Sequence, residues 1–406
     1  MKKSGRIKKI SFCAVPSLGA FALWRLHNSP LPREDLDFDA DLETRVESFH
    51  TEDGIALRLK RYVNNGAQPI ILAHGFLGNG LEFDLPHRGH NLALYLAERG
   101  YDVWISSFRG CGREPYLCET KGWNHSVDHL AALDAPALIK GVTETTGRPP
   151  IWIGHSMGGI VLYMYLQGVK MVTGDGGFRV TADPDLARER NRSILGGVTI
   201  GSPPGLHCGG GAWIAKLSRL PFYETNTGLL IRFLDFLSGL SPKIPNSKIG
   251  DFVARFPRTG RVLAMRGPIA IGLYNVDNVD ADVGYSLLKW AGDNVSTRMT
   301  IQILALSRDP DLKDYNGECN YTANMNLINA PLLFITGTED FAGADNIREY
   351  GYERVSSAIK QFECYPGYGH TDLVMGKRVA EEIYPTILTW IEQLPSRSGG
   401  ASREPS

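Results

Sequence analysis

The chain has no marked excess of charge, and this argues against one class of partner. Its 406 residues contain 43 Lys and Arg against 44 Asp and Glu, so the formal net charge is −1. Proteins that bind nucleic acid need clustered cations to neutralise the phosphates. We therefore expect no nucleic acid partner.

Cysteines are also few. The six are too few for a disulfide-dense scaffold, and none of them forms a Cys-x-x-Cys pair, so the sequence predicts no zinc site of the usual spacing. Cys111 and Cys118 lie close enough in the chain to be bridged in an oxidising compartment. We favour the alternative that they are unpaired, buried thiols.

The chain lacks a hydrophobic run long enough to be a clear membrane span. Residues 10–24 are mostly apolar and follow several cations, but the run is short and Pro16 interrupts it. This pattern is typical of a signal peptide, with Ala20-Phe21-Ala22 as its cleavage site. An uncleaved anchor, a surface-bound helix and a disordered N-terminus are the alternatives. We expect membrane association or export through residues 1–25, with a cytoplasmic location as the alternative.

What the chain does have is a regular alternation of strand-like and helix-like patterns. Short apolar or alternating runs predict strands at residues 45–50, 56–63, 69–73, 101–106, 150–154, 195–200, 331–336 and 361–365. Helical patterns fall between them at residues 91–99, 126–147 and 157 onwards, and after them at 377–393. This rhythm predicts an α/β fold, a mostly parallel central sheet with helices on both faces.

The alternation stops between residues 207 and 327, where apolar and aromatic helical pieces replace it. An insertion of this length usually builds a lobe of its own. We predict an N-terminal segment and linker at 1–40, a core at 41–206 and 328–395, a mainly helical cap at 207–327 and a disordered tail at 396–406. The aromatic residues of the cap either line an apolar pocket or form the cap's own core.

A Gly-x-Ser-x-Gly pentapeptide, Gly154-His155-Ser156-Met157-Gly158, joins an apolar strand to a helix. A sharp strand-to-helix turn exposes a serine oxygen, and it needs small neighbours because strand and helix nearly touch there. The pattern predicts a nucleophile elbow with Ser156 as the nucleophile. A glycine-rich turn with an inert serine is the alternative.

Two further polar residues, Asp340 and His370, each follow a predicted strand. Parallel strands end at one edge of a sheet, so these side chains can meet Ser156 there. His370 would take the serine proton and return it to the leaving group, while Asp340 would fix the imidazole tautomer. Glu339 and Asp345 are competing acids, and we expect Asp372 to cap the next helix or to orient the histidine loop.

The developing oxyanion also needs hydrogen-bond donors. The backbone N–H of Met157 is the first predicted donor, because it directly follows the nucleophile. The second should come from the loop His74-Gly75-Phe76, with Phe76 as our choice and Leu77 as the alternative.

The order Ser156, Asp340, His370, together with several short blocks, resembles the acid lipase branch of the α/β-hydrolase family, which contains the lysosomal and gastric lipases. The similarity covers residues 44–206 and 330–392. Its blocks are Thr51-Glu52-Asp53-Gly54, His74-Gly75-Phe76, Gly100-Tyr101-Asp102-Val103-Trp104, Arg109-Gly110, Trp123-Asn124-His125-Ser126-Val127-Asp128, Asp134-Ala135-Pro136-Ala137, Gly154-His155-Ser156 and His370-Thr371-Asp372.

The resemblance implies an α/β-hydrolase fold and carboxylic ester hydrolysis through an acyl-enzyme on Ser156, with no metal ion or organic cofactor. The chain departs from the family at Met157, where acid lipases commonly have Gln, at residues 202–205 and throughout the insertion. The histidine block also resembles that of polyhydroxyalkanoate synthases, whose nucleophile is a cysteine, and Ser156 argues against that chemistry.

These observations predict a serine hydrolase that cleaves apolar or lipid-like acyl esters, small-molecule substrates held between the sheet edge and the cap. Acyl transfer to another alcohol, using the same residues, is one alternative. A non-catalytic binding protein with this fold is another. The sequence does not indicate an oligomeric state.

Overall fold

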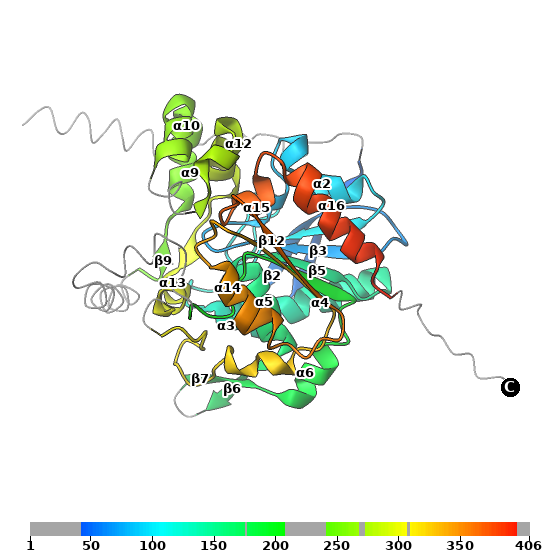
Figure 1. Cartoon of the computed structure of the whole chain (residues 1–406). Coiled ribbons are helices and arrows are strands. Elements are labelled where there is room, and N and C mark those ends of the chain that lie inside the picture. Colours follow the sequence, from blue (N-terminus) through cyan, green and yellow to red (C-terminus); the bar gives the residue numbers. More distant parts are fainter. Residues whose placement is uncertain (1–41, 175–176, 208–240, 268–272, 307–308, 396–406) are drawn as a thin grey trace, which may run out of the picture. The chain divides into compact units, whose positions relative to one another are not determined.

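The computed structural model describes residues 42–174, 177–207, 241–267, 273–306 and 309–395 (Figure 1). All of them belong to one compact unit within residues 37–406. The predictions for the N-terminal segment and for the tail at 396–406 concern residues outside the described part. No helix among the described residues combines the length and the hydropathy needed to cross a bilayer.

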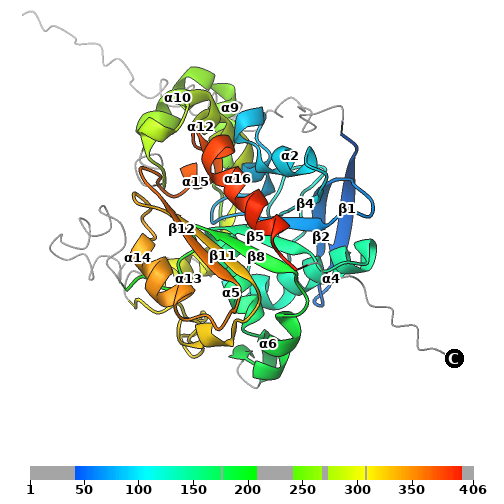
Figure 2. The same cartoon turned by 45° about the vertical axis from the view of Figure 1, so that its right-hand side comes forward.

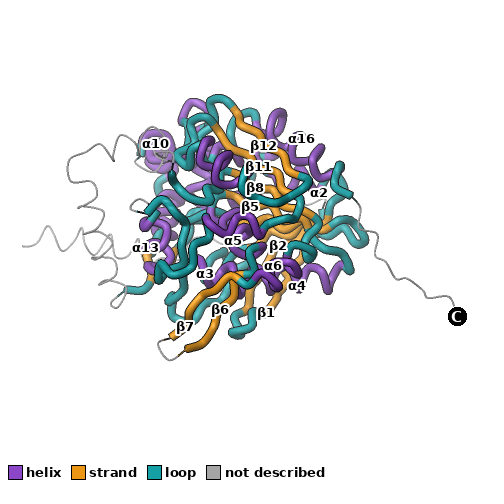
Figure 3. Tube along the Cα trace, turned by 60° about the horizontal axis from the view of Figure 1, so that its bottom comes forward, coloured by secondary structure: helices purple, strands orange, loops and turns teal. Residues whose placement is uncertain are grey.

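At the centre is an eight-stranded sheet with the order β1-β2-β4-β3-β5-β8-β11-β12 (Figure 3). Its strands are β1 Thr44–His50, β2 Ala56–Tyr62, β3 Pro69–Ala73, β4 Asp102–Ser106, β5 Ile151–His155, β8 Gly196–Ile200, β11 Leu332–Gly337 and β12 Lys360–Tyr365. β2 runs antiparallel to both of its neighbours, and all other neighbouring pairs are parallel. The predicted mostly parallel sheet is confirmed.

Helices cover both faces of this sheet (Figure 2). The principal ones are α2 Leu92–Ala97 and α16 Val379–Glu392 on one face, and α4 Ala135–Thr146 and α5 Met157–Leu166 on the other. Successive strand residues point to opposite faces, so Ile70 packs with α2 and α16 while Ile71 packs with α4 and α5. A strand covered on both faces needs a continuous apolar run, which is what β3 and β5 have.

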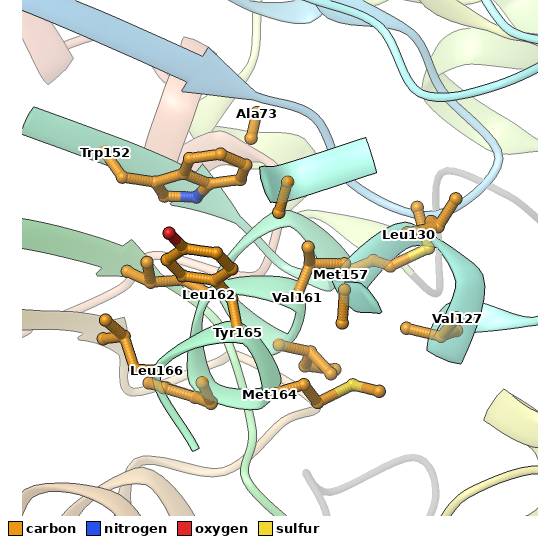
Figure 4. Packing of buried hydrophobic residues seen from close by; sticks show 14 of the residues in the cluster. Ala73, Val127, Leu130, Trp152, Met157, Val161, Leu162, Met164, Tyr165 and Leu166 are labelled. Atoms are coloured by element: carbon orange, nitrogen blue, oxygen red, sulfur yellow. The ribbon is translucent and has the colours of Figure 1, made fainter. Parts of the chain in front are cut away.

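The elbow helix α5 lies entirely inside the protein. All ten of its residues are buried, and Figure 4 shows its apolar side chains packed beside Ala73, Leu130 and Trp152 from other elements. An isolated surface helix would show one apolar stripe, whereas α5 is apolar all round because other elements enclose it. The core therefore holds the helix that follows Ser156 from every side.

The long helical segment after Ser126 continues through Pro136, a residue that would be expected to kink a helix or to split it in two. It consists of α3 Val127–His129, a π-helical stretch at Leu130–Asp134 and then α4, with Pro136 in the first turn of α4. Proline has no N–H to donate, and Pro136 stands where the hydrogen-bond register changes from π-helical to α-helical. The hydrogen-bond register thus changes ahead of the proline while the helical segment continues. Gly147, with φ of 71°, ends it as predicted.

Two elements after α5 were missed in the sequence. A hairpin of β6 Val169–Gly174 and β7 Gly177–Ala182 is followed by helix α6 Pro184–Arg190 (Figure 3). We had expected α5 to lead directly to β8. The hairpin strands form a separate two-stranded sheet, so they do not change the order of the main one.

The described part of the insertion (residues 207–327) is mainly helical. Its helices are α9 Ser247–Arg255, α10 Pro257–Arg266, α12 Ala281–Ser286, α13 Thr297–Ala305 and a π-helical stretch at Leu287–Ala291, and the short strands β9 Lys243–Ile244 and β10 Val295–Ser296 pair with each other. Several aromatic residues on which the prediction rested lie outside the described residues: Trp213, Phe222, Tyr223, Phe233 and Phe236. Leu312, Tyr321 and Met325 share the core of α5. The predicted domain limits stay predictions.

Candidate active site

Ser156 lies at the turn between β5 and α5, with a strained backbone of φ 51° and ψ −115°. Small neighbours make this turn feasible. A Cβ added to Gly158 would lie 2.0 Å from the Ala73 carbonyl oxygen, and one added to Gly154 would lie 2.4 Å from the Gly158 carbonyl carbon. The strand-to-helix turn that the pentapeptide predicts is therefore present, with its glycines at points of backbone contact.

The structure brings the three residues predicted as a triad together. The Nε2 atom of His370 lies 2.8 Å from Ser156 Oγ, and its Nδ1 atom lies 2.8 Å from Asp340 Oδ1. A carboxylate can only accept, so Nδ1 carries the proton and Nε2 is left to accept the serine hydroxyl hydrogen. All three side chains are buried. This is the arrangement that activates a serine by proton removal.

Of the three neighbouring acids, only Asp340 reaches His370. Glu339 and Asp345, the competing candidates, are exposed, whereas Asp340 is 1% exposed. Its Oδ1 also accepts the Ala342 N–H at 2.8 Å, and its buried Oδ2 has no hydrogen-bond partner among the described residues. Gly201, with φ of 58°, passes close to Oδ2, where an added Cβ would lie 2.8 Å away. The second oxygen thus leaves unpaired negative charge beside the imidazole.

The loop predicted to supply an oxyanion donor lies next to Ser156. A Cβ added to Gly75 would lie 3.2 Å from Ser156 Cβ. Among the described residues, neither the Phe76 N–H nor the Met157 N–H has a hydrogen-bond partner. Leu77 has φ of 64°, and its carbonyl accepts the Asp293 N–H at 2.9 Å, so the loop is tied to the insertion. Two unpaired donors beside a serine are what a developing oxyanion requires.

A second buried carboxylate, Glu82, lies behind this loop in the 3₁₀ turn Gly80–Phe83. Its Oε1 accepts the Gly75 N–H at 2.9 Å and lies 3.1 Å from His155 Nδ1. Burial alone would lower the pKa of His155, but the charge of Glu82 and its hydrogen bond raise it above the usual value. The other ring nitrogen, Nε2, lies 3.3 Å from the His370 carbonyl oxygen.

The fold and this geometry match a known family. The family model described as "Alpha/beta hydrolase family" matches residues 70–382, which is more than half of the chain. The chain belongs to this family.

Relatives of this alpha/beta hydrolase include named lipases. It is 32% identical over 126 residues to Triacylglycerol lipase 2 of Arabidopsis thaliana, covering 27% of this chain and 30% of that protein. It is 33% identical over 122 residues to human gastric triacylglycerol lipase, covering 27% and 31%. The matched stretch thus spans about a third of either relative's length. The resemblance to the group of gastric lipases is confirmed.

A solved structure extends the likeness of the fold over almost all of the hydrolase. A bacterial membrane phospholipase A covers 94% of this chain and 96% of its own, with a TM-score of 0.53 and 12% sequence identity. At that identity the likeness concerns the fold alone. The two chains therefore share a fold over most of their length.

The histidine loop of the hydrolase is oriented by Asp372, as one of the two predicted roles of this residue requires. Its carboxylate accepts the Gly369 N–H at 3.0 Å, the Asn275 N–H at 3.2 Å and Asn278 Nδ2 at 2.9 Å. The last two donors belong to the insertion. The loop that carries His370 is therefore held from the core and from the insertion together.

Three residues around the triad were not found from the sequence: Glu82, His155 and Gly201. Glu82 stands in an apolar stretch with no motif, and its partners are 7 and 73 positions away. His155 was seen only as the variable position of the pentapeptide. Their contacts arise from the packing of separate strand ends, and no local pattern encodes such a contact.

The thiol prediction is also settled by the structure. Cys111 and Cys118 are unpaired and buried, which is the alternative that we favoured. Burial raises the pKa of Cys118 to about 12, so this thiol stays protonated near neutral pH. Among the described residues, no group of three or more His, Cys, Asp and Glu side chains is arranged to hold a metal ion.

Proposed function

We propose that the protein is a serine hydrolase that cleaves carboxylic esters with apolar or lipid-like acyl groups through an acyl-enzyme on Ser156. One observation carries the proposal: the hydrogen-bonded series from Ser156 Oγ through His370 to Asp340, with 2.8 Å at each step, at a strained strand-to-helix turn. The named lipases among the relatives support the reaction class.

Acylation begins when Ser156 Oγ attacks the ester carbonyl carbon and its proton passes to His370 Nε2. The resulting imidazolium is stabilised by the Asp340 carboxylate. When the tetrahedral intermediate collapses, the C–O bond to the alcohol breaks and His370 returns the proton to the leaving oxygen. Water repeats the sequence against the acyl-enzyme, releasing the acid and free Ser156.

The negative charge on the tetrahedral oxygen is stabilised by the N–H groups of Phe76 and Met157. Both are backbone donors, so their positions are set by the loop after β3 and the first turn of α5. Loss of one such donor typically costs about 10²–10³ in rate. Side-chain substitution would test them poorly, because the donor belongs to the backbone.

The apolar surroundings of the triad support an apolar acyl group. The ring of Phe341 lies 4.2 Å from the His370 ring, centroid to centroid. Phe76 and Leu77, on the loop beside Ser156, pack against the main core without being fully buried. Acyl chains bind where such side chains exclude water.

A fluorophosphonate probe tests the proposal directly, because it reacts covalently only with an activated serine. The native protein should be labelled and should hydrolyse p-nitrophenyl esters, faster for longer acyl chains up to the capacity of the site. Ser156→Ala should lose both activities. Ser202→Ala is the matched control, since Ser202 is also buried and donates to the Ile200 carbonyl, outside the triad.

Failure of the native protein to be labelled would contradict the proposal. Acyl transfer, the alternative drawn from the sequence, uses the same three side chains. It is distinguished by its products: hydrolysis releases free acid with water as the sole acceptor, whereas an acyltransferase forms a new ester only when an alcohol is supplied.

A further inference from the structure

Helices α9 and α10 form the outermost helical pair of the insertion, next to α12 (Figures 1 and 2). Few of their residues are fully buried. Gly250, Val253, Gly260 and Ala264 are their buried residues, and Val253 and Ala264 pack against Leu288. The remaining sides of both helices face away from the sheet.

The outward side of this pair carries apolar side chains. Ile249, Phe252 and Phe256 are 38%, 43% and 39% exposed, and Val262 on α10 is 57% exposed. A spacing of three residues places Ile249 and Phe252 on one side of α9. Phe256 directly follows the helix, and its ring lies 5.0 Å from that of Phe252. Of the eight large exposed hydrophobic residues described for the chain, three lie on these two helices and a fourth, Phe256, joins them. Such a concentration marks an interaction surface.

The segment that contains both helices, residues 247–266, is strongly basic, although the whole chain has a net charge of −1. Residues 247–266 contain one acid, Asp251, and five cations: Lys248, Arg255, Arg258, Arg261 and Arg266. Arg258 and Arg266 are exposed and form no ion pair with any residue that the structure describes, while Arg261 pairs with the exposed Asp282. The exposed apolar residues are therefore accompanied by unneutralised positive charge.

We propose that this face of α9 and α10, made of Ile249, Phe252, Phe256 and Val262 with Arg258 and Arg266, docks on a negatively charged lipid surface. Helices that lie in a lipid–water interface combine exposed aromatic and aliphatic side chains with Lys and Arg. The apolar side chains would enter the boundary between headgroups and acyl chains, and the guanidinium groups would contact lipid phosphates. A neutral apolar partner would leave the cations without counter-charges.

The docking face is connected to the candidate active site. Asn246, the residue before α9, donates from Nδ2 to the Leu77 carbonyl at 3.3 Å, and Asn79 donates to the Trp290 carbonyl at 3.1 Å. α9 has nine residues, and such a helix is about 14 Å long. Docking would thus bring the loop of Phe76 near the lipid surface. The proposed docking is a binding property and does not depend on the proposed hydrolysis.

Vesicle sedimentation of the full chain tests this surface. Ser156→Ala serves as the background, so that lipid is not hydrolysed during the measurement. We expect binding to vesicles of phosphatidylcholine mixed with phosphatidylglycerol, weakened by salt, and much weaker binding to phosphatidylcholine alone. Arg258→Gln and Arg266→Gln should each weaken binding about fivefold. Phe252→Ala with Phe256→Ala should weaken it about tenfold or more.

Two matched controls separate the docking face from general surface effects. Val262→Ala should weaken binding. Val46→Ala should not, because Val46 has a similar exposure, 49%, but lies on β1, outside the docking face. Arg148→Gln, an exposed arginine in the turn before β5, should leave binding unchanged. Thermal unfolding of every variant should match the background protein, because the side chains removed are exposed.

Three results would each overturn the docking proposal. The first is equal binding of all variants, which would assign lipid binding to another part of the chain. The second is equal binding to neutral and anionic vesicles. The third is a dimer, seen by sedimentation velocity, that the Phe252→Ala and Phe256→Ala variants dissociate, because the face would then cover a second copy of the chain.

A separate observation concerns Glu82. The His370 carbonyl can only accept, so His155 Nε2 must carry a proton, and its Nδ1 faces the Glu82 carboxylate. We infer that Glu82 is a positioning residue that holds three parts of the site in register: the oxyanion loop through Gly75, the elbow through His155 and, through His155, the loop of His370. This inference rests on the proposed function.

Glu82 and Asp84 are buried carboxylates at the same turn, so one can be tested against the other. Glu82→Gln should lower kcat about 10- to 100-fold with KM nearly unchanged, because a small displacement of the oxyanion loop affects the transition state most. Asp84→Asn is the control. Asp84 is equally buried and pairs with Lys60 at 2.9 Å, away from the triad. Its substitution should lower the melting temperature and leave kcat within about twofold.

The outcomes distinguish this inference from the proposed function. Equal losses of kcat in Glu82→Gln and Asp84→Asn would make Glu82 merely structural, as would a change in KM alone. An unchanged kcat in Glu82→Gln, with Ser156→Ala inactive, would overturn the positioning role and leave the hydrolase standing. A native protein without esterase activity or labelling would overturn both.

Discussion

The central sheet and the insertion differ in how their elements are enclosed. β3, β5 and β8 are buried along their whole length, whereas α9 buries only Gly250 and Val253. The same contrast holds for charge. Arg109 and Asp134 pair at 3% and 0% side-chain exposure, while Arg261 and Asp282 of the insertion pair at 43% and 62%.

This difference in enclosure determines how strongly each element constrains the positions of its neighbours. An element enclosed on all sides fixes its neighbours, because interiors are close-packed and transmit any displacement. An element with one buried side constrains little beyond that side. The reactive groups are attached to the enclosed elements, and the described insertion helices adjoin them through a few hydrogen bonds. The candidate catalytic side chains are thus held by enclosed elements, whereas the outer helices have fewer constraints.

The largest expected effect belongs to the enclosed part. Asp340→Asn should lower kcat for a p-nitrophenyl ester about 10⁴-fold, because an amide no longer fixes the His370 tautomer. Glu339→Gln and Asp345→Asn, which change the exposed acids on either side, should stay within about twofold. If either of them matched Asp340→Asn, the assignment of the acid would be wrong.

Glycines in the two regions should respond differently to an added methyl group. Gly158→Ala would place Cβ 2.0 Å from a backbone oxygen, whereas Gly260→Ala would meet the Val253 and Tyr285 side chains at 2.7 Å and 2.8 Å. We expect a loss of about 4 kcal/mol in the free energy of unfolding for the first and about 1 kcal/mol for the second. Urea unfolding measures both, and equal losses would contradict the contrast.

Ion pairs offer a third comparison. Asp134→Asn should cost about 3 kcal/mol of unfolding free energy, because it leaves the buried Arg109 guanidinium without a counter-charge on that side. Asp282→Asn breaks an exposed pair and should cost less than about 0.5 kcal/mol. Urea titration of each variant measures both losses. A loss for Asp282→Asn as large as that for Asp134→Asn would contradict the expected difference between exposed and buried ion pairs.

The last comparison is a pH dependence from two buried histidines, which develops only in acid. Burial lowers the pKa of His125 to about 3 and that of His129 to about 4. Both histidines stay neutral in the folded protein, but in the unfolded chain they take up protons below about pH 6.5. Their contribution to the free energy of unfolding is therefore complete above that pH and is lost as the pH falls. Each should remove about 1.4 kcal/mol of unfolding free energy per pH unit between about pH 6 and 4.5.

Urea unfolding of His129→Gln over this range should show a shallower pH slope than the native protein. The exposed His50 provides the control, because His50→Gln removes a histidine without removing a buried one. An unchanged slope in His129→Gln would show that other groups cause the acid sensitivity.

Much of the enclosed part was readable from the sequence. The strands around the elbow are continuous apolar runs, and burial on both faces requires such runs. The proximity of Ser156, Asp340 and His370 could be predicted because each follows a strand, and parallel strand ends meet at one edge. The π-helical stretch at Leu130–Asp134 and the β6–β7 hairpin were not found, since neither has a period or a motif that separates it from its neighbours.

The sequence by itself determined the order of the reactive groups and the small residues at the elbow, because these depend on local strand-to-helix geometry. Only the tertiary structure decided which acid reaches His370, that Glu82 lies behind the oxyanion loop, and which side of α9 stays exposed. The physical reason is range. A hydrogen bond acts over about 3 Å, and residues far apart in the chain come that close only when the whole sheet has formed.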